Sequence, residues 1–201
     1  MKQAAFHANG RGDRSLERLV REGVLHGVLD ISLQELTGRV CEGIFDAGPD
    51  RLREAGRQGV PQIAAPGGTD CIVLGPLSSL SDEHRARPVI VHNHSITMVR
   101  TAEAEMAAIG RLIADRINEA RGPAEVLIPF RGFSSADRQR ELFYAPEADG
   151  ALVTALEATV NPLVPVARIA AHVHDRTFAE AVARAVRCLM KKEPAPGSFL
   201  A

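Results

Sequence analysis

The stretch that decides the fold is TAEAEMAAIGRLIADRINEARGPAEVLIPFRG, residues 101–132. Acidic residues open it, and its apolar residues then recur three and four positions apart, which predicts an amphipathic helix. Gly122 and Pro123 end that helix. The segment EVLIPF, residues 125–130, is an almost continuous apolar run of strand length. A helix followed by such a strand is typical of a parallel sheet that helices cover on both faces. The apolar stripe of the helix consists of Met106, Ile109, Ile113, Ile117 and Ala120.

The same alternation of strand and helix continues in both directions from this stretch. We expect further strands at residues 3–7, 27–31, 60–65 and 89–91, and one within residues 163–171. Asp13 is expected to cap a first helix, Pro49 to open another, and Thr177 with Glu180 to form the capping box of the last. The Gly- and Pro-rich segment 66–79 is expected to be a loop.

These elements predict an α/β fold, a three-layer α/β/α sandwich with a Rossmann-like, mostly parallel sheet of about six strands. We expect a single domain over residues 1–192 and a flexible tail over residues 193–201.

The composition restricts the classes of partner and the compartment. The 201 residues include 24 Lys and Arg and 25 Asp and Glu, and this balance argues against a nucleic-acid-binding face. Three Cys residues without a CxxC pair fit a reducing compartment. The N-terminus lacks the apolar core of a signal peptide, and no apolar run approaches the roughly 20 residues of a membrane span. We therefore expect a cytoplasmic protein with neither a nucleic-acid nor a membrane partner.

The candidate site is the edge of the sheet where the parallel strands end. Ligands of such sheets bind outside the carboxyl ends of the strands. A small anionic molecule is the expected ligand, because glycine, histidine and arginine gather there. The candidate ligand-binding residues are His7, Asn9, Gly10, Arg11, Gly12, Asp30, Pro66, Gly67, Gly68, Thr69, Asp70, His92, Asn93, His94, Arg100, Arg131, Gly132 and His174.

Each group in this set also has a structural interpretation. Residues 9–13 lead into a helix N-terminus, which can bind phosphate or carboxylate, but they also fit a tight turn. Residues 66–70 contain two consecutive glycines, which let a ligand approach the backbone closely but also fit a tight turn. Arg131 can hold an anion or pair with the acidic loop that follows, and Asp30 can hold a ribose hydroxyl or cap a turn.

The two HxH pairs, at residues 92–94 and 172–174, raise the question of a metal. Most of these histidines lie beyond the expected strand ends, and no third-ligand motif accompanies them, so we predict no metal. A hydrolase or lyase that uses His92, His94 or His174 as acid–base groups is an alternative function. A purely structural interaction subunit is another. A serine nucleophile elbow, GxSxG, is absent.

Several segments in fixed order carry a family resemblance. GVLDISLQEL, EGIFDAGPDRLREAGRQGVPQIAAPGGTD, VHNHSITMVRT, LIPFRGFS, FYAPEADGAL and HVHDRTFAEAVA resemble the C-terminal half of the Tm-one-like ATP-binding family, over about residues 5 to 190. The resemblance implies a Rossmann-like subdomain, ATP as a possible cofactor, and either a homo-oligomer or association with a companion N-terminal half.

The chain departs from the family pattern at two segments and near its start. The family's HNP-like triplet is HNH here, and its DLT-like segment is DIS. FHANG, residues 6–10, resembles a strand that other members precede with a further strand and helix. We therefore expect an exposed sheet edge, which favours pairing with another chain.

Overall fold

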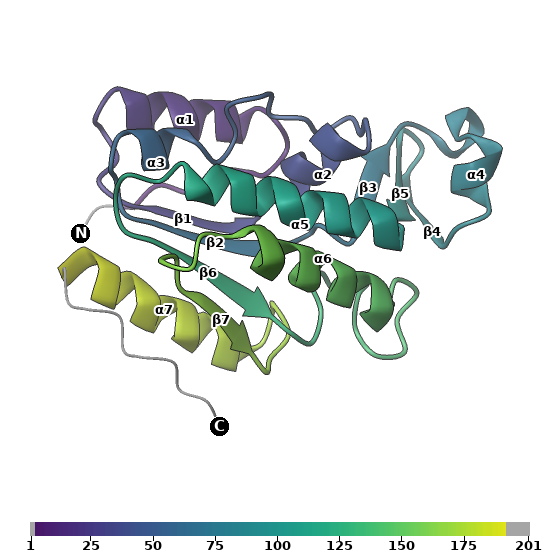
Figure 1. Cartoon of the computed structure of the whole chain (residues 1–201). Coiled ribbons are helices and arrows are strands. Elements are labelled where there is room, and N and C mark those ends of the chain that lie inside the picture. The colour runs from purple at the N-terminus through teal and green to yellow at the C-terminus, as the bar shows by residue number, and fades with distance from the viewer. Residues whose placement is uncertain (1–2, 192–201) are drawn as a thin grey trace.

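The computed structural model describes residues 3–191 and contains a parallel sheet of four strands, which Figure 1 shows in place. The order is β1-β2-β6-β7, and each neighbouring pair is parallel. The strands are β1 (Val28–Ser32), β2 (Gln62–Gly67), β6 (Ala124–Pro129) and β7 (Val166–Ile169). They are short and rich in apolar residues, and β2 is buried along its whole length. The predicted α/β class is confirmed.

Helices cover both faces of this sheet (Figure 1). The helices on one face are α1 (Gly12–Arg21), α2 (Gln34–Val40), α3 (Glu54–Arg57), α5 (Glu103–Asn118) and α6 (Pro146–Thr159). Met106, Ile109, Ile113 and Ile117 of the apolar stripe are fully buried there against α6 and the sheet, whereas Ala120 follows the end of α5 and is partly exposed. On the other face, α7 (Arg176–Lys191) packs Phe178 and Val182 against Ile63 and Leu127. The long amphipathic helix therefore behaves as its periodicity predicts.

The prediction of about six parallel strands was wrong, because a second sheet takes part of the chain. This antiparallel sheet has the order β3-β5-β4. Its members are β3 (Cys71–Leu74), β4 (Val89–Asn93) and β5 (Ile96–Arg100), with the short helices η1 (Leu77–Ser79) and α4 (Asp82–Arg85) between β3 and β4. The expected strand at residues 89–91 exists, but it belongs to this sheet.

Two local predictions fail. Residues 3–7 form no strand, and they pair with no described strand. The expected loop 66–79 contains β3, whose CIVL run pairs with β5 despite its Gly-rich neighbours. A pairing of this kind joins segments that are far apart in sequence, and local composition does not report it.

The helix boundaries differ from the predicted ones by a few residues. Asp13 lies inside the first turn of α1, not before it, and Thr177 lies inside α7. In the segment between Pro49 and β2, only Glu54–Arg57 is helical. The expected tail, residues 193–201, lies outside the described residues. No helix within residues 3–191 is both long enough and apolar enough to cross a membrane.

Candidate functional site

The loops that follow the four parallel strands contact one another and form one continuous rim. Leu33 N–H donates to Gly67 O (2.9 Å), and Gly68 N–H donates to Phe133 O (2.8 Å). Val173 N–H donates to Gly132 O (3.1 Å) and ties the loop after β7 to the loop after β6. The structure thus brings together the predicted site residues of segments 66–70 and 131–132 and the segment that carries His174.

Two glycines of this rim are required by packing. Gly132 has φ +126°, and a Cβ built on it would lie 1.9 Å from Asp137 O. A Cβ on Gly67 would lie 2.3 Å from Ile31 O. Real Cβ atoms do not come so close to a carbonyl oxygen, so both positions exclude any side chain. The close contact of the rim loops explains these glycines without a ligand.

Exposed cationic side chains gather on the rim between the loops after β6 and β7. Arg131 is exposed, and no ion pair joins it to any residue between 3 and 191. Arg138 is half exposed, and its Nη2 lies 3.0 Å from His172 Nδ1 and 3.3 Å from Asp175 Oδ1. The sequence analysis missed Arg138, because it lies inside a long loop with no strand to mark its position.

The His172 ring is fixed in place beneath these cations. The residue is buried, and its Nε2 lies 2.7 Å from Ser134 O, which can only accept. Its Nδ1 accepts from the backbone N–H of His174 (3.1 Å), so the proton of the neutral ring is on Nε2. The exposed His174 ring lies 5.2 Å from the His172 ring. Partial burial, and then the electrostatic influence of His172 and Arg138, lower the pKa of His174.

Behind the rim lies a network of buried acids and one arginine. Asp70 is fully buried and accepts from Ser134 Oγ (2.6 Å); burial raises its pKa to about 6. Arg100 is also buried and donates to Phe143 O (2.7 Å) and to Asp70 O (3.0 Å). It pairs with Asp149, whose pKa burial raises to about 8. Asp70 and Arg100 were predicted to bind ligand, but their side chains hold the rim loops from inside.

Two further residues of the predicted site, Pro66 and Thr69, are buried as well. The Thr69 hydroxyl donates to Pro66 O (2.8 Å) and so closes the turn after β2. Of the segment 66–70, only Gly68 is partly exposed. That turn can therefore offer a ligand the backbone of Gly68, but not its buried side chains.

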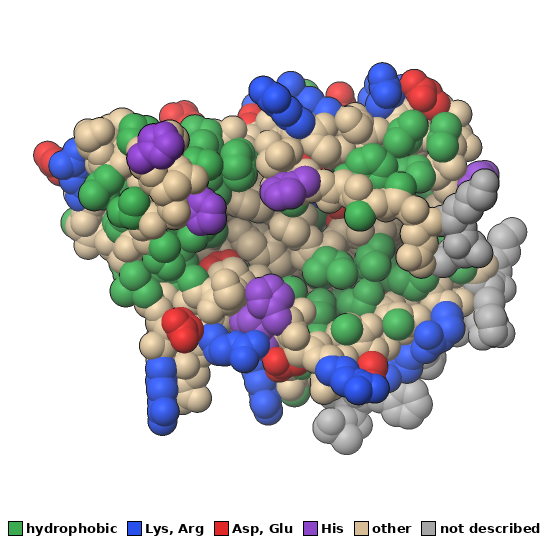
Figure 2. All heavy atoms as spheres, turned by 180° about the vertical axis from the view of Figure 1, so that it is seen from behind, with side chains coloured by type: hydrophobic (Ala, Val, Ile, Leu, Met, Phe, Trp, Pro, Cys, Tyr) green, Lys and Arg blue, Asp and Glu red, His purple; other side chains and the backbone are tan. Residues whose placement is uncertain are grey.

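The HNH triplet lies away from the ends of the parallel strands. His92 and Asn93 belong to β4, and His94 follows at the turn into β5; all three are exposed. Asn93 Oδ1 accepts from Ser95 N–H (2.9 Å) and shapes this turn. Asn93 and His94 line a pocket of about 440 Å³ together with Pro76, Leu77, Ser78, Arg85 and Val91. Figure 2 shows histidine side chains at several points around a hollow on this side of the molecule.

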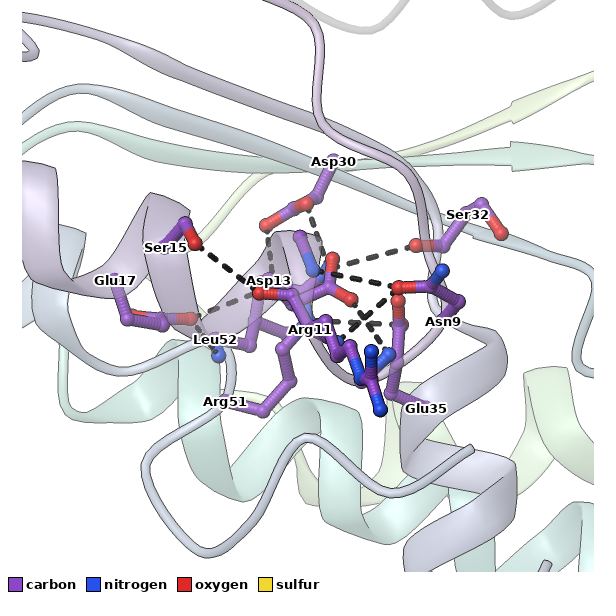
Figure 3. Close-up of polar contacts among 12 residues, drawn as sticks. Asn9, Arg11, Asp13, Ser15, Glu17, Asp30, Ser32, Glu35, Arg51 and Leu52 are labelled. Carbon is purple, nitrogen blue, oxygen red and sulfur yellow. Dashed lines mark hydrogen bonds and ion pairs between the residues drawn. The ribbon is translucent and has the colours of Figure 1, made fainter. Parts of the chain in front are cut away.

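In the loop before α1, neighbouring side chains accept hydrogen bonds from the backbone N–H groups. Asn9 Oδ1 accepts from Arg11 N–H (3.2 Å) and Gly12 N–H (3.3 Å), and Gly10 N–H donates to Asp13 Oδ2 (3.2 Å). His7 O would contact a Cβ on Gly12 at 2.3 Å, so this is a tightly folded turn. The amides of Gly10, Arg11 and Gly12, which the sequence suggested for a phosphate, are therefore already occupied (Figure 3).

Beside this loop, Arg51 lies in the centre of a buried acidic cluster (Figure 3). The residue is 1% exposed and binds Asp30 through two hydrogen bonds of 2.8 and 2.7 Å. It also pairs with Glu17 (3.5 Å) and lies within 3.6 Å of Asp13 and Glu35. Asp30, a predicted ligand residue, is thus engaged at both oxygens by Arg51. The sequence marked none of the other four as site residues, because they come from three different segments.

One carboxyl of this cluster has a strongly altered pKa. Both Glu35 oxygens are buried and make no hydrogen bond to a protein donor in the described structure. Burial, and then the neighbouring Asp13, raises the pKa of Glu35 to about 9. A raised carboxyl pKa stabilises the fold fully below the unfolded value, about 4.5, and that contribution is lost as pH rises towards 9.

Glu35→Gln is therefore expected to stabilise the protein at pH 8 to 9, by about 1–3 kcal/mol, because the amide cannot ionise. At pH 5 the variant and the original chain are expected to have similar stability. Urea unfolding at both pH values measures the difference. Glu103→Gln, at an exposed position of α5, is the control. Equal stability of Glu35→Gln and the original chain at both pH values would contradict the raised pKa.

Within residues 3–191, no three His, Cys, Asp or Glu side chains are grouped so that they could hold a metal ion. Of the rim residues described above, Arg131, Arg138 and His174 have exposed side chains, and Gly68 has a partly exposed backbone.

Comparison with known proteins assigns the family. The sequence model of the "Uncharacterised protein family (UPF0261) C-terminal domain" matches residues 1–190. The chain belongs to this family. It is 37% identical over 188 residues to a UPF0261 protein of Clostridium tetani, covering 93% of this chain and 46% of that protein. A UPF0261 protein of Rhizobium meliloti is 38% identical over 184 residues, covering 90% and 46%.

A plant relative supports the resemblance found in the sequence. The ToMV resistance protein Tm-1(GCR237) of Solanum lycopersicum is 31% identical over 179 residues, which cover 88% of this chain and 24% of that protein. The resemblance to the Tm-one-like family is confirmed. This UPF0261 domain spans less than half the length of the curated relatives it matches.

Proposed function

We propose that this UPF0261 domain binds a phosphorylated or other anionic small molecule, such as a nucleotide, at the rim between the loops after β2, β6 and β7. The observation that carries the proposal is the pair of exposed guanidinium groups of Arg131 and Arg138, with the exposed His174 ring beside them, around the half-exposed carboxylate of Asp175. A guanidinium binds a phosphate through two parallel hydrogen bonds, which gives both affinity and orientation. ATP is the first nucleotide to test, because the family resemblance implies it.

The geometry of the rim supports this choice over the other predicted positions. The backbone amides before α1 are occupied by Asn9 and Asp13, and the acids around Arg51 oppose an anion there. At the rim the acids Asp70 and Asp137 are fully buried, whereas the cations are exposed. An anion therefore meets positive charge at this surface before it meets these two acids.

Arg131→Gln and Arg138→Gln are each expected to weaken binding of ATP or pyrophosphate by about tenfold, the loss expected from one charge-assisted contact. Isothermal titration with ATP, pyrophosphate and a phosphosugar measures the dissociation constants. Arg184→Gln, at an exposed position of α7, removes the same charge away from the rim and should bind as the original chain does.

Two results would contradict the proposal. One is the absence of any heat or thermal shift with all three ligands. The other is binding that all three variants retain equally, because the anion would then lie elsewhere. Arg138→Gln also loses its contacts with His172 and Asp175, so its unfolding midpoint must be measured beside its affinity.

A second candidate function is a hydrolase or lyase at the same rim. It is favoured by His174, whose lowered pKa leaves the ring neutral and able to accept a proton near pH 7. In that case His174→Ala should abolish phosphate release from bound ATP while ATP still binds. If the original chain releases no phosphate, the binding proposal stands without this reaction.

A further inference from the structure

Within the described residues 3–191, the outer edge of β1 is open and the apolar surface beside it is uncovered. β1 is a terminal strand of the parallel sheet, and no described strand pairs with its side away from β2. Leu29 and Ile31 of β1 are 40% and 38% exposed. Val28 and Asp30 alternate with them along β1 and are buried on the opposite face of the sheet, which α1 covers. On the face of the sheet that carries Leu29 and Ile31, α7 therefore covers β2 and β6 but leaves β1 uncovered.

A groove of about 760 Å³ runs along this open edge. One wall is β1, the other is the N-terminal segment of residues 3–8, and the last residues of α7, Leu189 and Met190, close one side. Most of the side chains that line the groove are apolar. Figure 2 shows a broad apolar patch on the face of the molecule opposite to that of Figure 1. An apolar surface of this kind beside an open strand is typical of an interaction site.

Like the outer edge of β1, the N-terminal wall of the groove has backbone groups without backbone partners among the described residues. Residues 3–6 have no regular structure, and none of their backbone groups bonds to the backbone of another residue in the range 3–191. A small apolar molecule in the groove would leave these amides and carbonyls, and those of the β1 edge, without partners. An extended polypeptide supplies N–H and C=O groups to both walls at once.

We infer that this groove receives an extended strand from the N-terminal part of a UPF0261 protein. The matching family model is that of a C-terminal domain, and this chain covers only 46% of the Clostridium tetani relative. Such proteins therefore hold a long polypeptide outside the matched domain. A strand from it would extend the parallel sheet beyond β1, and its apolar side chains would cover Leu29 and Ile31.

A second copy of the domain fits the groove less well than a single strand does. Residues 3–8 stand opposite β1 across the groove, so the edge of another sheet cannot lie flat against β1. A lone extended segment can enter between the two walls.

The test uses the N-terminal region of the Clostridium tetani relative, up to the start of its match to this chain, as the probe. Titration of the present chain with this region should show saturable binding. Hydrogen exchange should slow at residues 3–8 and 28–32 on binding. Leu29→Lys should weaken binding at least about tenfold, because it places an unpaired charge in the covered groove. Leu163→Lys, at a position that is 89% exposed, is the matched control and should bind normally.

Three outcomes would overturn the inference. They are unchanged exchange at both walls, equal binding by Leu29→Lys and the original chain, and slow exchange in the chain alone. If the slow exchange of the chain alone becomes slower still at higher protein concentration, a second copy fills the groove. If it does not depend on concentration, the chain fills the groove itself. Circular dichroism verifies that Leu29→Lys folds, and Ile31→Lys replaces it if it does not. The exchange experiment on the original chain decides the question in either case.

Discussion

Arg51→Met is expected to lower the free energy of unfolding by about 3–5 kcal/mol, the cost of removing one partner from a buried charge pair. Arg51 is 1% exposed and is the cation that Asp13, Glu17, Asp30 and Glu35 share. Methionine keeps much of the volume but leaves these acidic side chains in a dry environment without their cation. Chemical denaturation monitored by circular dichroism measures the change.

The loss should depend on pH in a defined direction. Burial raises the pKa values of Glu17 and Glu35, and Arg51 opposes this rise. Loss of the guanidinium should therefore raise both pKa values further, and a carboxyl group whose pKa is raised by folding destabilises the fold as pH rises. Arg51→Met should therefore lose more stability at pH 8 than at pH 5. Arg18→Met, whose guanidinium is exposed and pairs with the exposed Glu22, should change stability by less than about 0.5 kcal/mol. A loss below about 1 kcal/mol in Arg51→Met at pH 8 would show that the acids do not need this cation.

Gly132→Ala is expected to destabilise the protein by at least about 3 kcal/mol, since the backbone conformation and the packing both oppose a side chain. The φ of +126° is one that residues with a Cβ rarely adopt. The new methyl group would also overlap Asp137 O and contact the His172 ring, at 1.9 and 2.8 Å. Thermal and urea unfolding measure the loss.

The same substitution tests how the rim is built. If Gly132→Ala folds at low temperature, it should bind anions more weakly, because the loops after β6 and β7 are then displaced. Gly150→Ala is the control: Gly150 lies in α6, and no atom lies within 4 Å of the place that its new methyl group would take. That variant should be stabilised by up to about 1 kcal/mol, because alanine favours a helix. Similar stabilities for the two alanine variants would refute the packing argument.

The sequence alone was enough for the elements whose pattern is local. The stripe of α5 and the apolar runs of β2, β6 and β7 predicted their type and approximate position, because helix and strand periodicities are set by neighbouring residues. The rim loops after β2, β6 and β7 follow from these parallel strands, so Gly68, Arg131 and His174 could be placed at one edge. Their roles in binding stay predictions.

What the sequence could not decide depends on contacts between distant segments. The antiparallel sheet joins Cys71–Leu74 to Ile96–Arg100 and removes the HNH triplet from the parallel strand ends.

Arg51 and Arg100 carry the same side chain as Arg131, yet the first two are buried among carboxylates and carbonyls, while the third is exposed. Only the folded structure distinguishes the two buried arginines from the exposed one. A charged side chain takes a structural role when loops from elsewhere in the chain supply its partners and exclude water.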